Sequence, residues 1–369
     1  MSEPALRICT IVGARPQFVK AAVVSRAIDR WNARREGRLV EEQIIHTGQH
    51  YDENMSQVFF DELGIRPPAV NLNVGSGRHG EMTGQMLAGI ESILLEQRPD
   101  CVLVYGDTNS TLAGALAAAK LHIPIAHVEA GLRSFNRRMP EEINRVVTDH
   151  LSTWLFCPTT TAMENLAREG LTKGALNVGD VMLDASLHFR EQALGRSTVL
   201  ERLGLQAGGY VLATCHRAEN TDDRARLEAI VRALATLAET MPVVLPLHPR
   251  TRNAIEASGL TSSLGKVTVT EPVPFLDMVR LEASARVIVT DSGGVQKEAY
   301  FFRVPCVTLR DETEWTETVA AGANRLVGAS YERIVSSVLE APFACAWPSL
   351  YGDGTAGERV LRELIRFSG

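Results

Sequence analysis

The sequence lacks the marks of several large protein classes. Its six cysteines form no CxxC pair, which disfavours a zinc site or a disulfide framework and favours buried thiols in a reducing compartment. No apolar run approaches the ~20 residues of a membrane helix, and no signal-peptide pattern opens the chain. A net charge of −6 disfavours general nucleic-acid binding. We therefore expect a cytoplasmic protein whose partners include neither a membrane nor nucleic acid.

The rest of the composition is that of an ordinary globular protein. At ~100–200 residues per domain, 369 residues suffice for two domains, and 45% of them are hydrophobic. Short β-branched runs alternate with segments of helical periodicity, which predicts parallel sheets with helices on both faces. The expected strands of the first half are Leu6–Val12, Glu42–His46, Cys101–Tyr105, Ile123–Val128 and Trp154–Cys157. The expected helices between them are Val19–Trp31, Met82–Gln97, Thr111–Leu121 and Glu141–His150.

The second half repeats this alternation. Its expected strands are Tyr210–Thr214, Val243–Pro246, Lys266–Val269, Val287–Thr290 and Cys306–Leu309, with helices such as Asp223–Glu239 and Gly294–Phe302. The predicted fold class is therefore α/β, with two Rossmann-like domains at residues 1–182 and 183–350 and a crossover near Gly179–Leu205. Ligands of such folds bind beyond the carboxyl ends of the strands, so residues that follow strands are the candidates for function.

Basic residues follow the first expected strand. Gly13 opens a turn into a helix, where backbone N–H groups favour an anion, and Arg15 and Lys20 add positive charge. The alternative is an ordinary turn with two solvated basic side chains. Only one glycine is present, so the GxGxxG dinucleotide fingerprint is missing and an NAD-dependent reaction is disfavoured.

Three acids follow later strands of the first half. Asp107 comes after one strand, and taken alone it is best explained as the N-cap of the next helix. Glu129 follows the next strand, and Glu141 lies in a first helical turn, where a carboxylate is also favoured structurally. Together, the three acids are expected to face one crevice.

The second half supplies features suited to a nucleotide. His216 follows a strand, although a lone histidine there is more often an ordinary loop residue. The segment Thr290–Glu298 reads as a strand, a small-residue turn and a helix start, which aims N–H groups at a phosphate. Glu298, one turn into that helix, can accept hydrogen bonds from ribose hydroxyls. This division predicts a nucleotide held by one domain and acids supplied by the other.

These motifs together resemble the non-hydrolysing UDP-N-acetylglucosamine 2-epimerase family. The motifs run in the family's order: GARPQ with Lys20, HTGQH, VYGDTNST, HVEAGLRS, MPEEINR, CHRAEN, HPRT and TDSGGVQKE. The resemblance implies a glycosyltransferase-B-like fold, with the active site between two Rossmann-like domains. It also implies that a last helix, at about residues 357–369, packs back on the first domain.

The resemblance implies specific roles for individual residues. The catalytic group comprises Asp107, Glu129, Glu141 and His216. The substrate-binding group comprises Arg15, Lys20, Arg145, Met278, Ser292, Gly293, Gly294 and Glu298, with the uracil pocket near Phe275–Met278. The implied ligands are a UDP-sugar and UDP, and the implied assembly is a homodimer.

The implied reaction gives the three acids a purpose. The proton on carbon 2 of the sugar is too weakly acidic for a carboxylate to remove outright, but it becomes far more acidic as the anomeric C–O bond to UDP breaks. One acid then removes the proton to give a 2-acetamidoglucal, another protonates the opposite face, and UDP re-adds. The sequence leaves open which acid serves which face. The reaction needs no NAD and no metal, and it would supply precursors of surface polysaccharides.

Three departures from the common family pattern bear on the substrate. GTRPE is replaced by GARPQ, and the arginine of TERPE is replaced by Trp315. The segment before the PEE acids carries Arg137 and Arg138. This set of three departures resembles the subgroup acting on UDP-2,3-diacetamido-2,3-dideoxy-glucuronate. These arginines either contact a carboxylate at carbon 6 or are solvated. Some members have an allosteric UDP-GlcNAc site linked to a QHxxM motif; residues 49–55 have a wider spacing, so the sequence leaves the presence of that site open.

Three other functions remain possible on the residues alone. A glycosyltransferase of this fold would also bind a UDP-sugar, although transfer commonly needs one base rather than three acids. A hydrolysing 2-epimerase would release free N-acetylmannosamine and UDP. A non-enzymatic nucleotide-sugar sensor would explain the diphosphate seat but not the acids.

Overall fold

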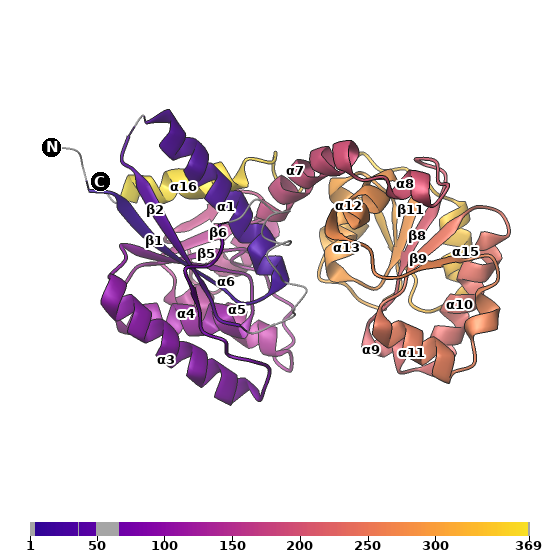
Figure 1. Ribbon diagram of the computed structural model, residues 1–369, viewed down its shortest axis with the longest axis horizontal. Coiled ribbons are helices and arrows are strands. Elements are labelled where there is room, and N and C mark those ends of the chain that lie inside the picture. The colour runs from indigo at the N-terminus through magenta and orange to yellow at the C-terminus, as the bar shows by residue number, and fades with distance from the viewer. Residues whose placement is uncertain (1–3, 36, 49–65, 368–369) are drawn as a thin grey trace. The chain divides into compact units, whose positions relative to one another are not determined.

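Two parallel β-sheets organise the chain into two units. The computed structural model describes residues 4–35, 37–48 and 66–367 (Figure 1). The first unit comprises Met1–Ala185 and Tyr351–Gly369, and the second comprises Ser186–Leu350. None of the helices in the described ranges combines the length and apolar character needed to cross a membrane.

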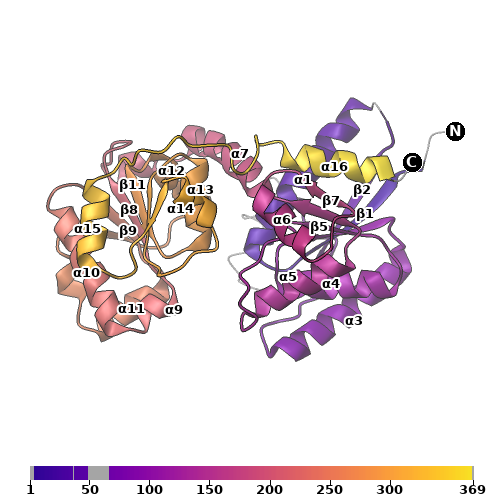
Figure 2. The same ribbon diagram turned by 180° about the vertical axis from the view of Figure 1, so that it is seen from behind.

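The first unit contains a seven-stranded sheet in the order β3-β2-β1-β4-β5-β6-β7. Its strands are β1 Leu6–Val12, β2 Val40–His46, β3 Val70–Asn71, β4 Cys101–Tyr105, β5 Ile125–Val128, β6 Trp154–Cys157 and β7 Ala175–Asn177. Its helices are α1 Arg15–Arg34, α3 His79–Gln97, α4 Asn109–Lys120, α5 Pro140–Leu151, α6 Thr160–Arg168 and α16 Ala356–Phe367. The last helix, α16, packs on α1 at one face of the sheet, and α3, α4 and α5 cover the other (Figures 1 and 2).

The second unit contains a six-stranded sheet in the order β10-β9-β8-β11-β12-β13. Its strands are β8 Val211–Thr214, β9 Val243–Pro246, β10 Thr268–Thr270, β11 Val287–Thr290, β12 Cys306–Thr308 and β13 Asn324–Leu326. Its helices are α8 Val199–Arg202, α9 Ala218–Thr221, α10 Arg224–Ala238, α11 Pro249–Ala257, the 3₁₀ helix η1 Thr261–Leu264, α12 Phe275–Ser284, α13 Gly293–Phe301, α14 Thr316–Ala320 and α15 Tyr331–Leu339. Helix α7, Val181–Arg196, spans the boundary between the units.

Burial on both faces explains why the strands read as continuous apolar runs. Every residue of β4 and β5 is buried, as expected for parallel strands covered by helices on both sides. Two expected strands start two residues too early. Strand β5 begins at Ile125 because His122 has a left-handed backbone and Pro124 has no N–H to pair. Strand β10 begins at Thr268 because the chain still turns through Gly265, whose φ is +56°.

Both sheets reverse their winding direction at one point. In each, the first strand in sequence lies beside the fourth, so the reversal falls between β1 and β4 in the first unit and between β8 and β11 in the second. The crevice beyond the carboxyl ends of such a strand pair is where doubly wound sheets bind ligands. The turns after these four strands are therefore the places to examine for function.

Candidate active site

The turn after β1 is tied to the end of β4 by one buried side chain. The backbone N–H groups of Gly13 and Ala14 donate to Gln17 Oε1 at 2.8 and 3.1 Å, and Gln17 Nε2 donates to the Tyr105 carbonyl at 2.7 Å. These two N–H groups are thus already paired, so the expectation that this turn seats an anion is wrong for them. Basic charge remains on the exposed Arg15 and on Lys20.

Lys20 forms an ion pair with Glu129, the acid that follows β5. The two side chains are only 13% and 9% exposed, so solvent screens the pair little. Glu129 has a φ of +75°, which costs an L-residue roughly 1–2 kcal/mol. Such strain is concentrated at functional sites. Gly106 in the neighbouring turn leaves room for this pair, because a Cβ there would lie 3.2 Å from Glu129 Oε2 and 3.3 Å from Lys20 Nζ.

Asp107 forms an ion pair with Arg145 rather than capping a helix. Arg145 Nη2 and Nε lie 2.5 and 3.0 Å from Asp107 Oδ2. The expectation that Asp107 is the N-cap is wrong, because Thr108 occupies that position and its hydroxyl accepts the Thr111 N–H. Burial lowers the pKa of Arg145, but the carboxylates of Asp107 and Glu142 outweigh it and raise that pKa above its ordinary value. Asp107 is thereby held beside a permanent cation.

Two consecutive acids at the start of α5 have different environments. Glu141 is exposed, whereas Glu142 is 2% exposed. Glu142 accepts hydrogen bonds from the backbone N–H groups of Ser134 and Phe135, each at 2.9 Å, and from Arg145. Burial raises the pKa of Glu142, yet these donors outweigh it and lower the pKa below its usual value. Glu142 therefore holds the 134–138 loop, and Glu141 is the one that faces solvent.

In the second unit, a buried aspartate holds His216. Asp291 follows β11, is fully buried and accepts hydrogen bonds from the backbone N–H groups of His216 and Arg217 and from Asn220 Nδ2. His216 Nδ1 lies 3.3 Å from Asp291 Oδ1, which favours a proton on Nδ1 and a free lone pair on Nε2. Burial lowers the pKa of His216, and Asp291 opposes that shift, while His248, Arg217 and Arg250 add to it.

The turn after Asp291 opens helix α13 with small residues. Ser292 caps the helix by accepting the Val295 N–H, and Gly294 is exposed. Trp315 donates its indole N–H to the Gly293 carbonyl at 2.8 Å, and the Lys297 ammonium lies 4.3 Å from the centre of the Trp315 ring. Trp315, at the position where the common family pattern has an arginine, thus holds the turn through a hydrogen bond and places the Lys297 ammonium beside it.

A cavity of about 240 Å³ lies next to this turn. Its wall includes His216, His248 and Ser292 together with the apolar side chain of Met278. Phe275 instead packs edge-on against Phe189, so within the expected uracil region it is Met278 that reaches the cavity. Helix α13 also carries Glu298, whose pKa is raised by burial and lowered in part by Lys297.

Sequence reasoning missed three residues that hold this site. They are Gln17, Glu142 and Asp291, and each lies within one of the family motifs. The signal for Gln17 was its capping-box spacing. The signal for Glu142 was its place beside Glu141, and the signal for Asp291 was its place directly after a strand. The 49–55 segment, on which the allosteric question turns, lies outside the described residues. Within the described ranges, no three His, Cys, Asp or Glu side chains gather in a way that suits a metal ion.

Two Rossmann-like units with polar clusters at both switch points define a nucleotide-binding protein of glycosyltransferase-B-like architecture. The family model described as UDP-N-acetylglucosamine 2-epimerase matches residues 32–365, and the chain belongs to this family.

Individual relatives agree along the whole chain. A UDP-2,3-diacetamido-2,3-dideoxy-D-glucuronate 2-epimerase of Pseudomonas aeruginosa is 52% identical over 98% of this chain and 100% of the relative. A UDP-N-acetylglucosamine 2-epimerase homolog of Methanococcus maripaludis is 51% identical over 97% and 99%. The crystal structure of Methanocaldococcus jannaschii UDP-GlcNAc 2-epimerase in complex with UDP-GlcNAc and UDP has a TM-score of 0.84 and 44% identity, covering 98% of this chain and 99% of that one.

The pairing of Asp291 with His216 makes a prediction about titration. A neighbouring carboxylate favours the imidazolium form, so Asp291→Asn should lower the pKa of His216 further below its ordinary value. An NMR titration of the His216 ring protons measures this shift. Asp311→Asn, which removes an exposed carboxylate of the same unit that pairs with Arg226, is the control and should leave His216 unchanged. A His216 pKa that stays constant or rises in Asp291→Asn would contradict the assignment.

Proposed function

We propose that this protein interconverts UDP-2-acetamido sugars that differ in configuration at carbon 2, without releasing free sugar. The observation that carries the proposal is the division of residues between the two switch points. The first sheet presents Asp107 and Glu129 beside Arg145 and Lys20, and the second presents a small-residue helix start beside His216. The names of the relatives, which are 2-epimerases, support the same reaction.

The chemistry proceeds by elimination and addition. The anomeric C–O bond breaks, its electron pair leaves with UDP, and a carboxylate takes the proton from carbon 2 as the C1–C2 double bond forms. A second acid then delivers a proton to the opposite face of carbon 2 while a UDP oxygen bonds to carbon 1 again. Atoms balance without an oxidant, because the sugar loses one proton and UDP in the first step and gains one proton and UDP in the second.

The residues suit these two needs separately. The departing UDP carries negative charge, which the N-terminus of α13 and the cations Arg15 and Lys20 can stabilise. Burial lowers the pKa of His216 and its Nδ1 faces Asp291, so Nε2 can offer a lone pair to a hydroxyl of the substrate. Asp107, Glu129 and Glu141 supply the acid and base, each positioned general acid–base group being worth ~10²–10⁴-fold.

The substrate that we propose is the UDP-2,3-diacetamido uronate. The Pseudomonas aeruginosa relative is named for that sugar. The 134–138 loop exposes Arg137 and Arg138, and Glu142 fixes the loop to the helix that also carries Arg145. Two exposed cations on a loop that is held to the same helix as Arg145 are suited to a carboxylate at carbon 6 of the sugar. The alternative substrate is UDP-GlcNAc, which lacks that carboxylate.

Two further aspects of the protein belong to the same proposal. A cytoplasmic location is supported by the six free cysteines, which suit a reducing compartment. The homodimer rests on the family resemblance described above.

Exchange of the carbon 2 proton tests the reaction. In deuterated water without an acceptor, the wild-type protein should place deuterium at carbon 2 of a UDP-linked product, as read by mass spectrometry. Asp107→Asn and Glu129→Gln should lower that exchange by ~10²–10⁴-fold while UDP still binds, because neither change removes a cation or the helix start assigned to UDP. Glu164→Gln, an exposed carboxylate of the first unit, is the matched control with wild-type exchange.

Other outcomes of this experiment have distinct meanings. Free sugar with UDP would point to a hydrolysing epimerase, and transfer that needs an added acceptor would point to a glycosyltransferase. No exchange with either the diacetamido uronate or UDP-GlcNAc would overturn the proposal.

Loss of the loop arginines tests the substrate. The double change Arg137→Ala and Arg138→Ala should raise KM for the diacetamido uronate by about tenfold, as expected when a charged hydrogen bond is lost, and leave KM for UDP-GlcNAc unchanged. Arg168→Ala is the control; it removes an exposed arginine that lies 3.8 Å from Glu164 and donates to Asn165 Oδ1 at 3.3 Å. If the diacetamido uronate and UDP-GlcNAc are turned over equally, and the double change alters neither rate, the assignment of the uronate as substrate is wrong.

A further inference from the structure

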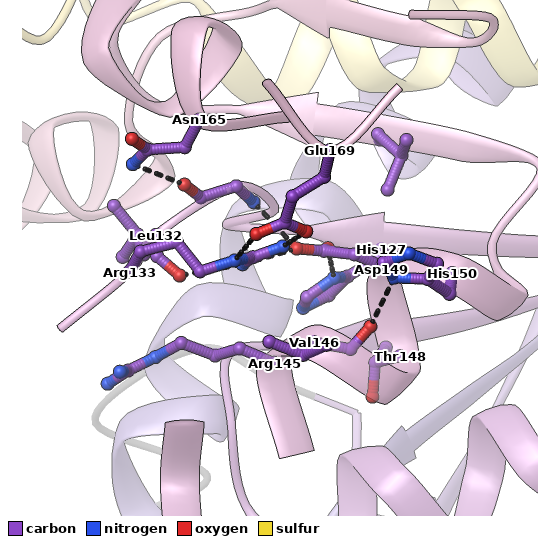
Figure 3. Close-up of polar contacts among 12 residues, drawn as sticks. His127, Leu132, Arg133, Arg145, Val146, Thr148, Asp149, His150, Asn165 and Glu169 are labelled. Atoms are coloured by element: carbon purple, nitrogen blue, oxygen red, sulfur yellow. Dashed lines mark hydrogen bonds and ion pairs between the residues drawn. The ribbon is translucent and has the colours of Figure 1, made fainter. Parts of the chain in front are cut away.

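A buried polar network lies beneath the turns that carry the candidate acids (Figure 3). His127, on β5, contacts Asp149, near the end of α5, with 2.7 Å between Nδ1 and Oδ1. Its other ring nitrogen, Nε2, lies 2.8 Å from the Gly106 carbonyl oxygen. Both side chains are fully buried, and the catalytic scheme above uses neither of them.

Both ring nitrogens of His127 face oxygen acceptors. A neutral imidazole has only one N–H, so in one of the two contacts the nitrogen lone pair would face an oxygen lone pair and repel it. If both contacts are hydrogen bonds, both nitrogens carry a proton and the ring is an imidazolium. The alternative, a proton on Asp149, is opposed by the donors around that carboxylate.

Those donors come from two sources. Asp149 Oδ2 accepts the Gly131 backbone N–H at 3.1 Å and lies 2.7 Å from Arg133 Nη1. Arg133 also donates to both oxygens of Glu169, at 2.7 and 2.8 Å. Burial raises the pKa of Asp149, but His127 and Arg133 outweigh it and lower that pKa. The carboxylates of Asp149 and Glu169 and the guanidinium of Arg133 together carry one net negative charge. An imidazolium at His127 balances it.

The network reaches every element that carries a candidate acid. Gly106 immediately precedes Asp107, so the ring holds the peptide group that leads into the first acid. Gly131 lies two residues after Glu129, so Asp149 holds the turn that bears the second acid. Asp149 itself belongs to α5, whose first turn contains Glu141.

We propose that His127, as a buried imidazolium paired with Asp149, is a positioning residue that fixes the Gly106–Asp107 peptide relative to the turn of Glu129. The inference rests on the proposed function, because it assumes that these acids act on substrate. His127 touches neither substrate nor the reacting atoms in this role and acts through the Gly106 carbonyl. A buried charge that must be fully paired gives that carbonyl one position, which an apolar side chain would not do.

Two substitutions separate the two contacts of the ring. His127→Gln introduces a longer side chain whose amide N–H lies near the position of Nε2, and so it can keep the donor to the Gly106 carbonyl. His127→Asn introduces a shorter side chain whose amide lies near Nδ1, and so it can keep the donor to Asp149 while losing the donor to Gly106. Each variant loses one hydrogen bond of the pair, which makes them controls for each other.

The expected result is a difference in kcat that folding stability does not explain. His127→Asn should lower kcat for carbon 2 exchange by about tenfold or more relative to His127→Gln, with the Kd for UDP unchanged in both. The melting temperatures of the two variants should be similar. If the two variants lose kcat equally, or in proportion to melting temperature, His127 is only structural and the inference is wrong.

A measurement on the wild-type protein covers the case in which either variant fails to fold. With ¹⁵N-labelled histidine, both ring nitrogens of His127 should show the chemical shifts of protonated nitrogen under the conditions of the exchange assay. One protonated and one unprotonated nitrogen would overturn the imidazolium. Failure of the wild-type protein to exchange the carbon 2 proton would instead overturn the proposed function, so the two failures are distinguishable.

Discussion

A buried carboxylate needs hydrogen-bond donors, and in this protein the donors belong to the turns that carry the candidate site. Leaving a buried charge unpaired costs several kcal/mol, so the donors are held strictly in place. Asp149 in the first unit and Asp291 in the second are both fully buried, and each pairs with a histidine Nδ1 and with at least one backbone N–H of a turn that follows a strand. Each unit thus uses one anion to fix its functional turn.

Fixed turns suit a reaction whose charges move. Elimination of UDP develops negative charge on the diphosphate and positive charge on the sugar, and dipoles that are already in place stabilise these charges without rearrangement. Trp315 shows how such a turn is maintained when one residue changes. Its indole holds the Gly293 carbonyl, and Lys297 lies over the ring, so a cation remains beside the turn although the arginine of the common pattern is absent.

Much of the fold was predictable because buried parallel strands leave a continuous apolar signal. β1, β4, β6, β9 and β11 begin and end at the residues that the apolar runs indicate. The edge strands β3, β7 and β13 have two or three residues each and include polar residues, so no apolar run marks them. Hydrogen bonds between residues far apart in the sequence could not be predicted either; Gln17, for example, bonds a residue 88 positions away. Nor does the sequence distinguish the buried Glu142 from the exposed Glu141, because only the path of the 134–138 loop decides which acid is enclosed.

The central claim is that a 2-acetamidoglucal and UDP lie on the reaction path, and the most direct measurement supplies both to the protein. Incubation of the 2-acetamidoglucal of the tested sugar with UDP in deuterated water should form a UDP-linked 2-acetamido sugar with one deuterium at carbon 2. Mass spectrometry and NMR of the product identify the label and its position. If no UDP-sugar forms under conditions in which the same preparation epimerises its UDP-sugar substrate, the elimination mechanism is contradicted.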